Sequence, residues 1–254
     1  MTATTDRRAD DRETEGLPIT ATRRICAVVG VGPGLGAAYA RRFHQSGYVV
    51  ALIARSAEAT RSLADELGER SCAYQCDITD EQAVTKTFAQ IAADLGAIDV
   101  LVYNAGSGVW GTIESVTAAD LETSWRINTL GLFLASQAVI PAMKLAGAGA
   151  IVITGATASR RGAAGTAIFA PAKAAQRALA ESMAKHLGPL GIHVALIVVD
   201  GVVDLPATRA RMPDKPDAFF VSPNDVAETA AWLTRQPRSA WSFEVEARPF
   251  AEKW

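Results

Sequence analysis

Apolar positions along this chain follow two alternating patterns. Short, nearly continuous apolar runs are typical of strands that are buried on both faces, and between them apolar residues recur at helical spacing. The apolar runs predict strands at residues 25–30, 48–54, 71–76, 98–103, 150–154, 192–199 and 242–246. The helical spacing predicts helices at residues 34–46, 57–67, 81–95, 117–144, 163–187 and 223–235.

Strand–helix alternation of this kind predicts a single α/β domain. Because crossovers between parallel strands are right-handed, helices cover both faces of the sheet, and we expect a doubly wound Rossmann sheet with strand order 3-2-1-4-5-6-7. A chain of 254 residues is long enough for one large domain of this type. We assign residues 24–254 to that domain, and we expect the polar residues 1–23 to form a disordered arm.

The composition argues against several classes of partner. Hydrophobic residues make up 49% of the chain, which is enough for a substantial core. The net charge is −2 and the sequence has no Lys/Arg cluster with interleaved aromatic residues, so nothing in it suggests a nucleic-acid partner. The N-terminal segment has no apolar signal region, and no uninterrupted apolar run reaches the roughly 18 residues that a membrane span needs. We therefore expect a soluble, cytoplasmic protein that binds neither nucleic acid nor membrane.

The residues that bind metals most often are few and scattered. The chain has three cysteines and three histidines: Cys26, Cys72, Cys76, His44, His186 and His193. The cysteine count is odd, no CxxC pair is present, and the histidines have no ligand-like spacing. We expect no disulfide framework and no metal site.

A glycine-rich loop, GVGPGLG at residues 30–36, follows the first predicted strand and opens the first predicted helix. Glycines at such a place let the backbone turn tightly and approach a pyrophosphate, while the helix N-terminus presents free N–H groups. In a strand–loop–helix context this pattern predicts a dinucleotide site. The residues that we expect to contact the cofactor here are Gly30, Gly34, Leu35 and Gly36.

The end of the second predicted strand carries Arg55. An acidic residue at that position would bind the 2′-hydroxyl of NAD, whereas a guanidinium suits the 2′-phosphate of NADP. The sequence therefore predicts NADP(H) as the cofactor.

These features resemble the short-chain dehydrogenase/reductase family over roughly residues 24–247. The glycines match its TGxxxGxG pattern, with Val29 in place of the Thr. Asp77-Ile78 is similar to the pair that contacts the adenine, and Tyr103-Asn104-Ala105-Gly106 is similar to the NNAG motif, so the resemblance adds Asp77, Ile78, Asn104, Ala105 and Gly106 to the cofactor site.

The resemblance also assigns catalytic positions. Asn128 matches the helix Asn that holds a water in the proton relay, and Lys173 matches the Lys of YxxxK, which binds the nicotinamide ribose and lowers the Tyr pKa. Phe169, however, stands where the family has its catalytic Tyr, and Ala156 stands where it has its catalytic Ser. We therefore expect an atypical active site, because neither substitute can transfer a proton.

The segment after the sixth predicted strand departs from the family in the same region. The family's Pro is Asp200, and its Thr that cradles the carboxamide is Leu205. Asp200 and Asp204 follow the carboxyl end of a strand, where ligands of such sheets bind, so either could act as a base or only cap a turn. We include Asp200 among the candidate catalytic residues.

Other groups could supply the missing proton or shape the pocket. Lys173 can titrate when buried, and the hydroxyls of Thr154, Thr157 and Ser159 are alternatives that could equally satisfy the backbone. Further residues expected near the mouth of the site are Tyr103, Ser107, Trp110, Phe219 and Phe220. The aromatic residues suggest an apolar or aromatic small-molecule substrate.

Three functions remain open. The first is an NADP(H)-dependent oxidoreductase acting on a small carbonyl or alcohol, and the second is a non-redox dehydratase, isomerase or cyclase on the same scaffold. The third is a non-catalytic nucleotide-binding module. By resemblance, the long helices and the C-terminal strand imply a homodimer or homotetramer.

Overall fold

The computed structural model describes residues 23–252. Its main sheet has seven parallel strands in the order β3-β2-β1-β4-β5-β6-β9. These strands are β1 (Ile25–Val29), β2 (Val49–Ala54), β3 (Ser71–Gln75), β4 (Val100–Tyr103), β5 (Gly149–Ala156), β6 (Ile192–Val199) and β9 (Glu244–Ala247). Since β9 is the seventh strand that the sequence predicts, the doubly wound Rossmann sheet and its order are confirmed. The disordered arm predicted at residues 1–23 lies outside the described residues except for its last residue.

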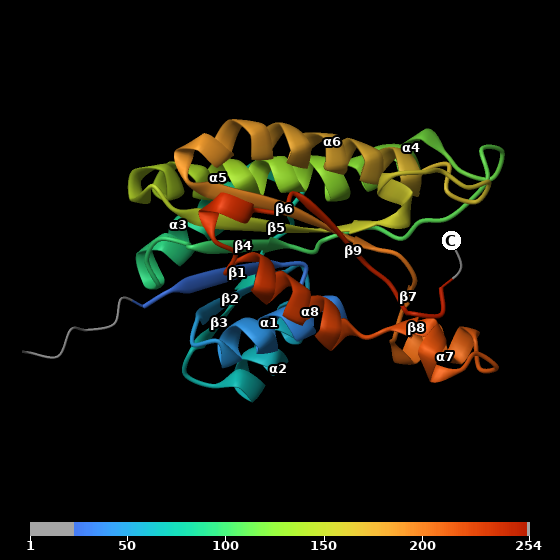
Figure 1. The fold of residues 1–254 in the computed structure, drawn as a ribbon, viewed down its shortest axis with the longest axis horizontal. Coiled ribbons are helices and arrows are strands. Elements are labelled where there is room, and N and C mark those ends of the chain that lie inside the picture. The colour runs from blue at the N-terminus through green and yellow to red at the C-terminus, as the bar shows by residue number, and fades with distance from the viewer. Residues whose placement is uncertain (1–22, 253–254) are drawn as a thin grey trace, which may run out of the picture.

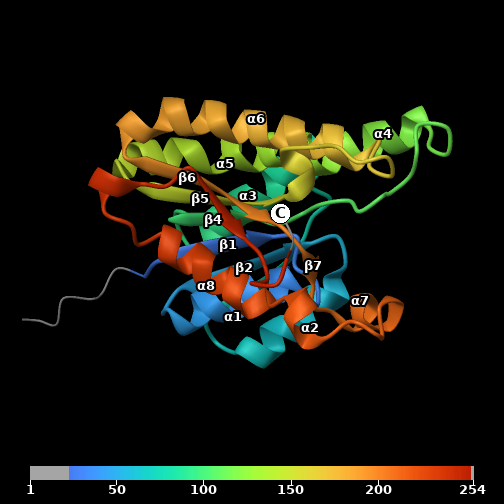
Figure 2. The same ribbon diagram turned by 45° about the vertical axis from the view of Figure 1, so that its right-hand side comes forward.

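Helices cover both faces of this sheet (Figures 1 and 2). One face carries α3 (Glu81–Asp94), α4 (Ala118–Trp125), α5 (Gly131–Ala146) and α6 (Phe169–Leu187). The other carries α1 (Leu35–Gln45), α2 (Ala57–Leu67) and α8 (Pro223–Leu233). The helix ends follow from local chemistry: the Asp80 carboxylate accepts from backbone N–H groups at the start of α3, and Thr117 with Asp120 forms a capping box before α4.

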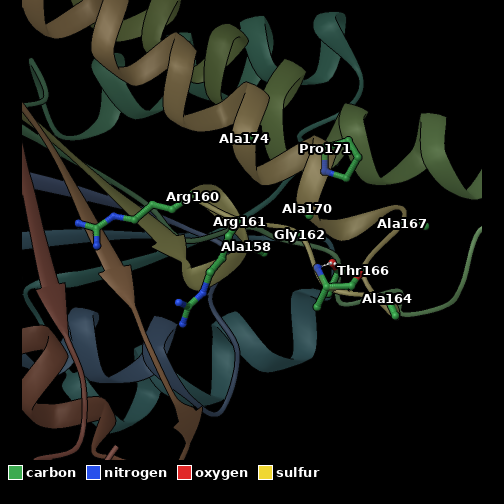
Figure 3. A pocket seen from close by; sticks show the side chains of 11 residues that line it. Ala158, Arg160, Arg161, Gly162, Ala164, Thr166, Ala167, Ala170, Pro171 and Ala174 are labelled. Atoms are coloured by element: carbon green, nitrogen blue, oxygen red, sulfur yellow. Dashed lines mark hydrogen bonds between the residues drawn. The ribbon is translucent and has the colours of Figure 1, made fainter. Parts of the chain in front are cut away.

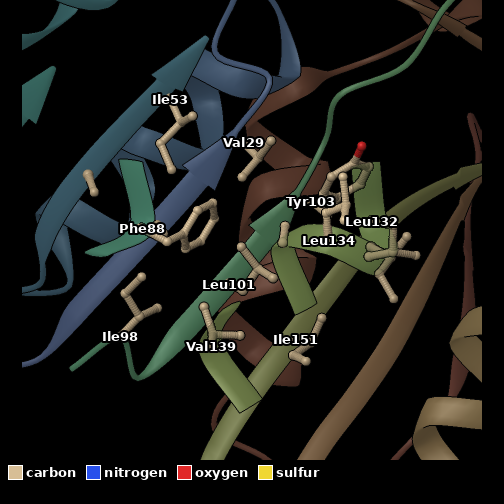
Figure 4. Packing of buried hydrophobic residues seen from close by; sticks show 14 of the residues in the cluster. Val29, Ile53, Phe88, Ile98, Leu101, Tyr103, Leu132, Leu134, Val139 and Ile151 are labelled. Atoms are coloured by element: carbon tan, nitrogen blue, oxygen red, sulfur yellow. The ribbon is translucent and has the colours of Figure 1, made fainter. Parts of the chain in front are cut away.

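Two hydrophobic clusters fill the spaces between the sheet and these helices. In the cluster under α3 and α5, Phe88 and Val139 lie over Leu101, which is fully buried in the middle of the sheet (Figure 4). The opposite cluster is formed by α1 and α8, with Tyr39 and Phe43 fully buried against the sheet. Burial of the sheet on both faces explains the nearly continuous apolar strands in the sequence.

The long helix predicted at residues 117–144 is continuous but not uniform. A five-residue π-helix, η1 (Arg126–Leu130), joins α4 to α5. By length and composition the segment Ala118–Ala146 could cross a membrane, although the sequence has no uninterrupted apolar run of that length. One side of this segment contacts the sheet through Leu132, Val139 and Met143, as a helix that packs on the core of a globular domain does.

Two differences from the predicted elements lie close to the candidate site. The helix expected from residue 163 begins at Phe169, because the chain before it forms a bridge between Gly111 and Thr166. The structure also contains three elements that the sequence did not indicate: β7 (Val202–Val203), α7 (Pro206–Arg211) and β8 (Phe220–Val221). The two short strands pair with each other beyond the carboxyl end of β6.

Candidate active site

The glycine-rich loop connects β1 to α1 and lies against the end of β4. Gly30 has a φ of +89°, and a Cβ atom there would lie 2.4 Å from the backbone nitrogen of Ala105. A Cβ on Gly36 would lie 2.4 Å from the carbonyl oxygen of Gly30. The Asn104 side chain donates to that same carbonyl oxygen at 2.9 Å. Only glycine fits this close approach. No side chain caps α1, and although the Ala37 N–H donates to the carbonyl oxygen of Gly32, the N–H groups of Leu35 and Gly36 have no hydrogen-bond partner among the described residues and can bind an anion.

A groove of about 640 Å³ runs beside this loop. It brings together seven of the predicted cofactor residues: Gly30, Arg55, Asp77, Ile78, Asn104, Ala105 and Gly106. Among the described residues, no hydrogen bond or ion pair engages the exposed Arg55 guanidinium, although its charge reaches Asp77. The pKa of Asp77 is lowered, first by the backbone N–H of Thr79 and in smaller part by Arg55.

A second cavity of about 560 Å³ adjoins the groove at the carboxyl ends of β4, β5 and β6, and we call it the inner cavity. It shares Asn104 and Gly106 with the groove and brings together Ala156, Phe169 and Lys173. Ligands of doubly wound sheets bind at this edge. Leu35 and Leu205 also line it, and Leu205 lies so close to the loop that a Cβ on Gly34 would meet its side chain at 2.7 Å.

Lys173 is the ionisable group at the centre of the inner cavity. The residue is 5% exposed, and its ammonium donates to the carbonyl oxygen of Thr154 at 2.9 Å and to Oε1 of Gln176 at 3.0 Å. Both partners are neutral, so no counter-ion offsets the cost of burying the charge, and burial lowers the pKa of Lys173 to about 7. An ammonium has three donors, which leaves one for a bound molecule.

Asn128 lies in the π-helix beside Lys173 and is fully buried. Its amide nitrogen donates to the carbonyl oxygen of Ser124 at 2.9 Å, while its Oδ1 has no hydrogen-bond partner among the described residues. The Gln176 side chain donates to the main-chain oxygen of Asn128 at 2.8 Å. Gln176 therefore bridges Lys173 and Asn128 directly, in the region where the family resemblance led us to expect a water.

Phe169 and Ala156 present no hydroxyl to the inner cavity. Phe169 begins α6, and its ring packs on that of Trp110, with centroids 5.2 Å apart and planes at 34°. The Lys173 ammonium lies 5.9 Å from the centre of the Phe169 ring. Ala156 ends β5, and both residues line the cavity.

The alternative hydroxyls all have partners within the protein. Thr154 pairs with the Tyr39 hydroxyl at 3.1 Å, and Ser159 accepts from the backbone nitrogen of Ala156 at 3.1 Å. Thr157 donates to the carboxylate of Asp200. These hydroxyls hold the end of β5 in place.

The two aspartates after β6 are also engaged. Asp200 accepts from Thr157 and lies 3.8 Å from the guanidinium of Arg248. Asp204 forms two hydrogen bonds with Arg209, at 2.7 and 2.8 Å. Neither carboxylate lines the inner cavity, whereas their neighbours Gly201, Val203 and Leu205 do.

Three of the residues expected at the mouth lie elsewhere. Tyr103 is fully buried, and its hydroxyl donates to the carbonyl oxygen of Ile127 at 2.5 Å. Phe219 and Phe220 contact each other at right angles, and the guanidinium of Arg209 lies over Phe220. The apolar lining instead includes Trp110, which the sequence did indicate.

Four residues of the site carried no role in the sequence argument: Tyr39, Ser124, Gln176 and Arg161. A signal existed for Gln176, because it is three positions after Lys173 on a helix and so shares its face. The partners of Tyr39 and Ser124 are distant in sequence or depend on the π-helix, and no local pattern shows them. Within residues 23–252, no cluster of three or more His, Cys, Asp or Glu could hold a metal ion.

Comparison with known proteins shows the family to which the chain belongs. The family model described as short chain dehydrogenase matches residues 24–216, and the chain belongs to the short-chain dehydrogenase/reductase family. A 3-oxoacyl-[acyl-carrier-protein] reductase of Bos taurus is 29% identical over 219 residues, which cover 84% of this chain and 92% of that protein.

Solved structures give the same result. A short-chain dehydrogenase from Rhodopseudomonas palustris is 33% identical, with a TM-score of 0.77 over 89% of this chain and 99% of that chain. A metagenomic short-chain oxidoreductase in complex with NADP is 27% identical, with a TM-score of 0.77 over 90% of this chain and 98% of that chain.

Proposed function

We propose that this protein is an NADP(H)-dependent oxidoreductase that acts on a small carbonyl or alcohol, with Lys173 in place of the tyrosine as its proton donor and acceptor. The observation that carries the proposal is the buried Lys173 ammonium, which lines the inner cavity with a pKa near 7 and one uncommitted N–H. The structurally similar oxidoreductase in complex with NADP supports the choice of cofactor.

The residues along the groove fit such a dinucleotide. The loop around Gly30 and Gly36 admits a pyrophosphate because no Cβ fills it, and Arg55 offers a guanidinium to a 2′-phosphate. Asp77 and Ile78 would bind the adenine, and Asn104 would hold the loop in shape. When bound, the cofactor supplies or accepts a hydride.

Lys173 is suited to the accompanying proton transfer. A pKa of about 7 means that the ammonium and the amine are both well populated near neutral pH, which is the condition for efficient general acid–base catalysis. In the reductive direction the ammonium would give a proton to the carbonyl oxygen of the substrate. In the oxidative direction the amine takes the proton from the alcohol.

The non-redox alternative is supported less well. It needs carboxylates as acid and base, and both Asp200 and Asp204 are held by other side chains outside the inner cavity. Only Lys173 among the groups suggested for that chemistry faces the cavity. A non-catalytic nucleotide-binding module remains an outcome of the test below.

The test combines binding and turnover. We expect NADPH to bind more tightly than NADH in a fluorescence titration, and we expect NADPH oxidation when a panel of small aldehydes and ketones is added. Lys173→Met should lower turnover by about 10²-fold or more, the range for loss of a general acid. NADPH binding without turnover on any carbonyl would favour the binding module, and absence of nucleotide binding would overturn the proposal.

We also propose that the protein acts in the cytoplasm as a homodimer or homotetramer. Exposed apolar residues on α4 and α5, namely Leu121, Trp125 and Phe133, support an interface on that face. Light scattering after size-exclusion chromatography would test the assembly. A monomer at micromolar concentration would contradict it.

A further inference from the structure

The inner cavity has an unbalanced charge. Among the described residues that line it, two are cationic, Arg161 and Lys173, and none is an aspartate or glutamate. Lys173 is already held by Thr154 and Gln176. The cationic group of the cavity whose donors are all uncommitted is therefore the Arg161 guanidinium.

Arg161 differs sharply from the arginine beside it. Arg160 forms hydrogen bonds with Glu244 at 3.0 and 2.7 Å and an ion pair with Glu246, both on β9. Figure 3 shows the two neighbouring guanidinium groups pointing in different directions from the end of η2 (Thr157–Ser159). The Arg161 side chain is exposed and has no hydrogen bond or ion pair with any described residue.

The backbone that carries Arg161 is well fixed. Its N–H donates to the carbonyl oxygen of Thr157 at 3.2 Å, which continues the turn of η2. The Ser159 hydroxyl, which accepts from the Ala156 nitrogen, ties the same turn to the end of β5. Arg161 is thus presented at a defined point on the cavity wall while its guanidinium stays available.

An apolar surface lines the same cavity. Trp110 packs on Phe169, and 63% of Trp110 is exposed, which is unusual for so large an aromatic side chain. The volume of about 560 Å³ is in the range of small-molecule sites. A ligand that covers both features has an apolar or aromatic body and an anionic end.

We propose that the inner cavity selects carboxylate-bearing substrates, such as aromatic oxo or hydroxy acids, and that Arg161 binds the carboxylate. A guanidinium matches a carboxylate in a bidentate pair, and the Trp110–Phe169 surface binds the apolar body. This inference rests on the proposed function only in taking the inner cavity as the substrate site. Arg161 is a specificity residue here, and the proton transfer stays with Lys173.

The experiment uses two probes that cannot be reduced. Calorimetry with NADPH-saturated protein would compare 3-phenylpropanoate with 3-phenylpropanamide, which differ in charge and hardly in shape. We expect the acid to bind about tenfold more tightly or better, as a charge-assisted pair predicts. Arg161→Met should remove this preference, and Arg161→Lys should keep part of it.

The matched control is Arg61→Met, which removes an exposed arginine on α2 that is outside the lining of the inner cavity and should leave both affinities unchanged. Equal binding of acid and amide by the unaltered protein would overturn the proposal, as would a preference that survives in Arg161→Met. A loss of NADPH affinity in Arg161→Met with the acid preference intact would assign the guanidinium to the cofactor instead. Because the probes need no turnover, repeating the comparison without nucleotide separates failure of this inference from failure of the proposed function.

Discussion

The Lys173 ammonium donates a hydrogen bond to the side-chain oxygen of Gln176 at 3.0 Å. The two residues are one helical turn apart on α6, and both are buried. Gln176 satisfies the ammonium without adding a negative charge, so the desolvation of Lys173 is not offset by a counter-ion. Burial therefore lowers the pKa of Lys173 to about 7, and the neutral partner leaves that shift in place.

The free energy of unfolding should depend on pH in a way that reflects the low pKa of Lys173. Between about pH 7 and the ordinary lysine value of 10.5, the unfolded chain binds a proton that the folded chain lacks, so folding becomes more favourable as pH rises. Below pH 7 both states hold the proton and the effect is constant. Compared with Lys173→Met, the unaltered protein should gain up to about 1.4 kcal/mol per pH unit from pH 7.5 to 9.

Urea unfolding of both proteins at several pH values measures that difference, and buried groups common to both, such as the Cys26 thiol, cancel. Lys86→Met removes a positive charge from the exposed side of α3 and is the control for a general charge effect. Parallel stability curves for the unaltered protein and Lys173→Met would show that Lys173 titrates at an ordinary lysine pKa.

Replacing the neutral partner should change this behaviour. In Gln176→Glu an ionised carboxylate would face the ammonium, and an opposite charge at that distance raises the pKa of a lysine. The pH range in which folding gains stability should therefore start well above pH 7. Gln176→Leu removes the same hydrogen bonds without adding a charge and should leave the pKa of Lys173 low. Identical pH profiles for the Glu and Leu variants would show that the partner does not control Lys173.

The fold and much of the cofactor groove could be predicted from the sequence because their signals are local. Each buried strand is a continuous apolar run, and the glycine loop needs residues without a Cβ at Gly30 and Gly36. The interior of the site could not be predicted in the same way. The Tyr103 hydroxyl donates a hydrogen bond to the carbonyl oxygen of Ile127 and is therefore not available to a ligand. Thr157 and Asp200, which follow the neighbouring strands β5 and β6, form a hydrogen bond with each other. Such pairings depend on tertiary distances.

Arg55 provides a test of cofactor choice. In Arg55→Asp the carboxylate would repel a 2′-phosphate and could accept a hydrogen bond from a 2′-hydroxyl. NADPH affinity should fall by about tenfold or more, and NADH affinity should stay the same or improve. Titrations with both nucleotides measure this, with Arg61→Asp as the control for an equal charge change on the following helix. Equal losses for the two nucleotides would contradict the role of Arg55.

The serine and tyrosine hydroxyls that the family has can be restored at Ala156 and Phe169, which both line the inner cavity. The double variant Ala156→Ser and Phe169→Tyr places a hydroxyl at the end of β5 and another at the tip of a ring whose centre is 5.9 Å from the Lys173 ammonium. If Lys173 in the unaltered protein is a less effective proton donor than a tyrosine, the double variant should reduce carbonyls about 10²-fold faster or more, within the usual range for a general acid.

Steady-state NADPH oxidation by the double variant measures this gain, with each single variant as its control. Ala156→Ser alone should gain little, because the tyrosine hydroxyl would still be missing, whereas Phe169→Tyr alone should account for most of the increase. NADPH affinity and the thermal unfolding midpoint should stay close to those of the unaltered protein, since a hydroxyl at the ring tip leaves the packing of residue 169 on Trp110 in place. Unchanged turnover with NADPH still bound would mean that the inner cavity is not arranged for hydride transfer, and it would favour the non-redox enzyme or the non-catalytic binding module.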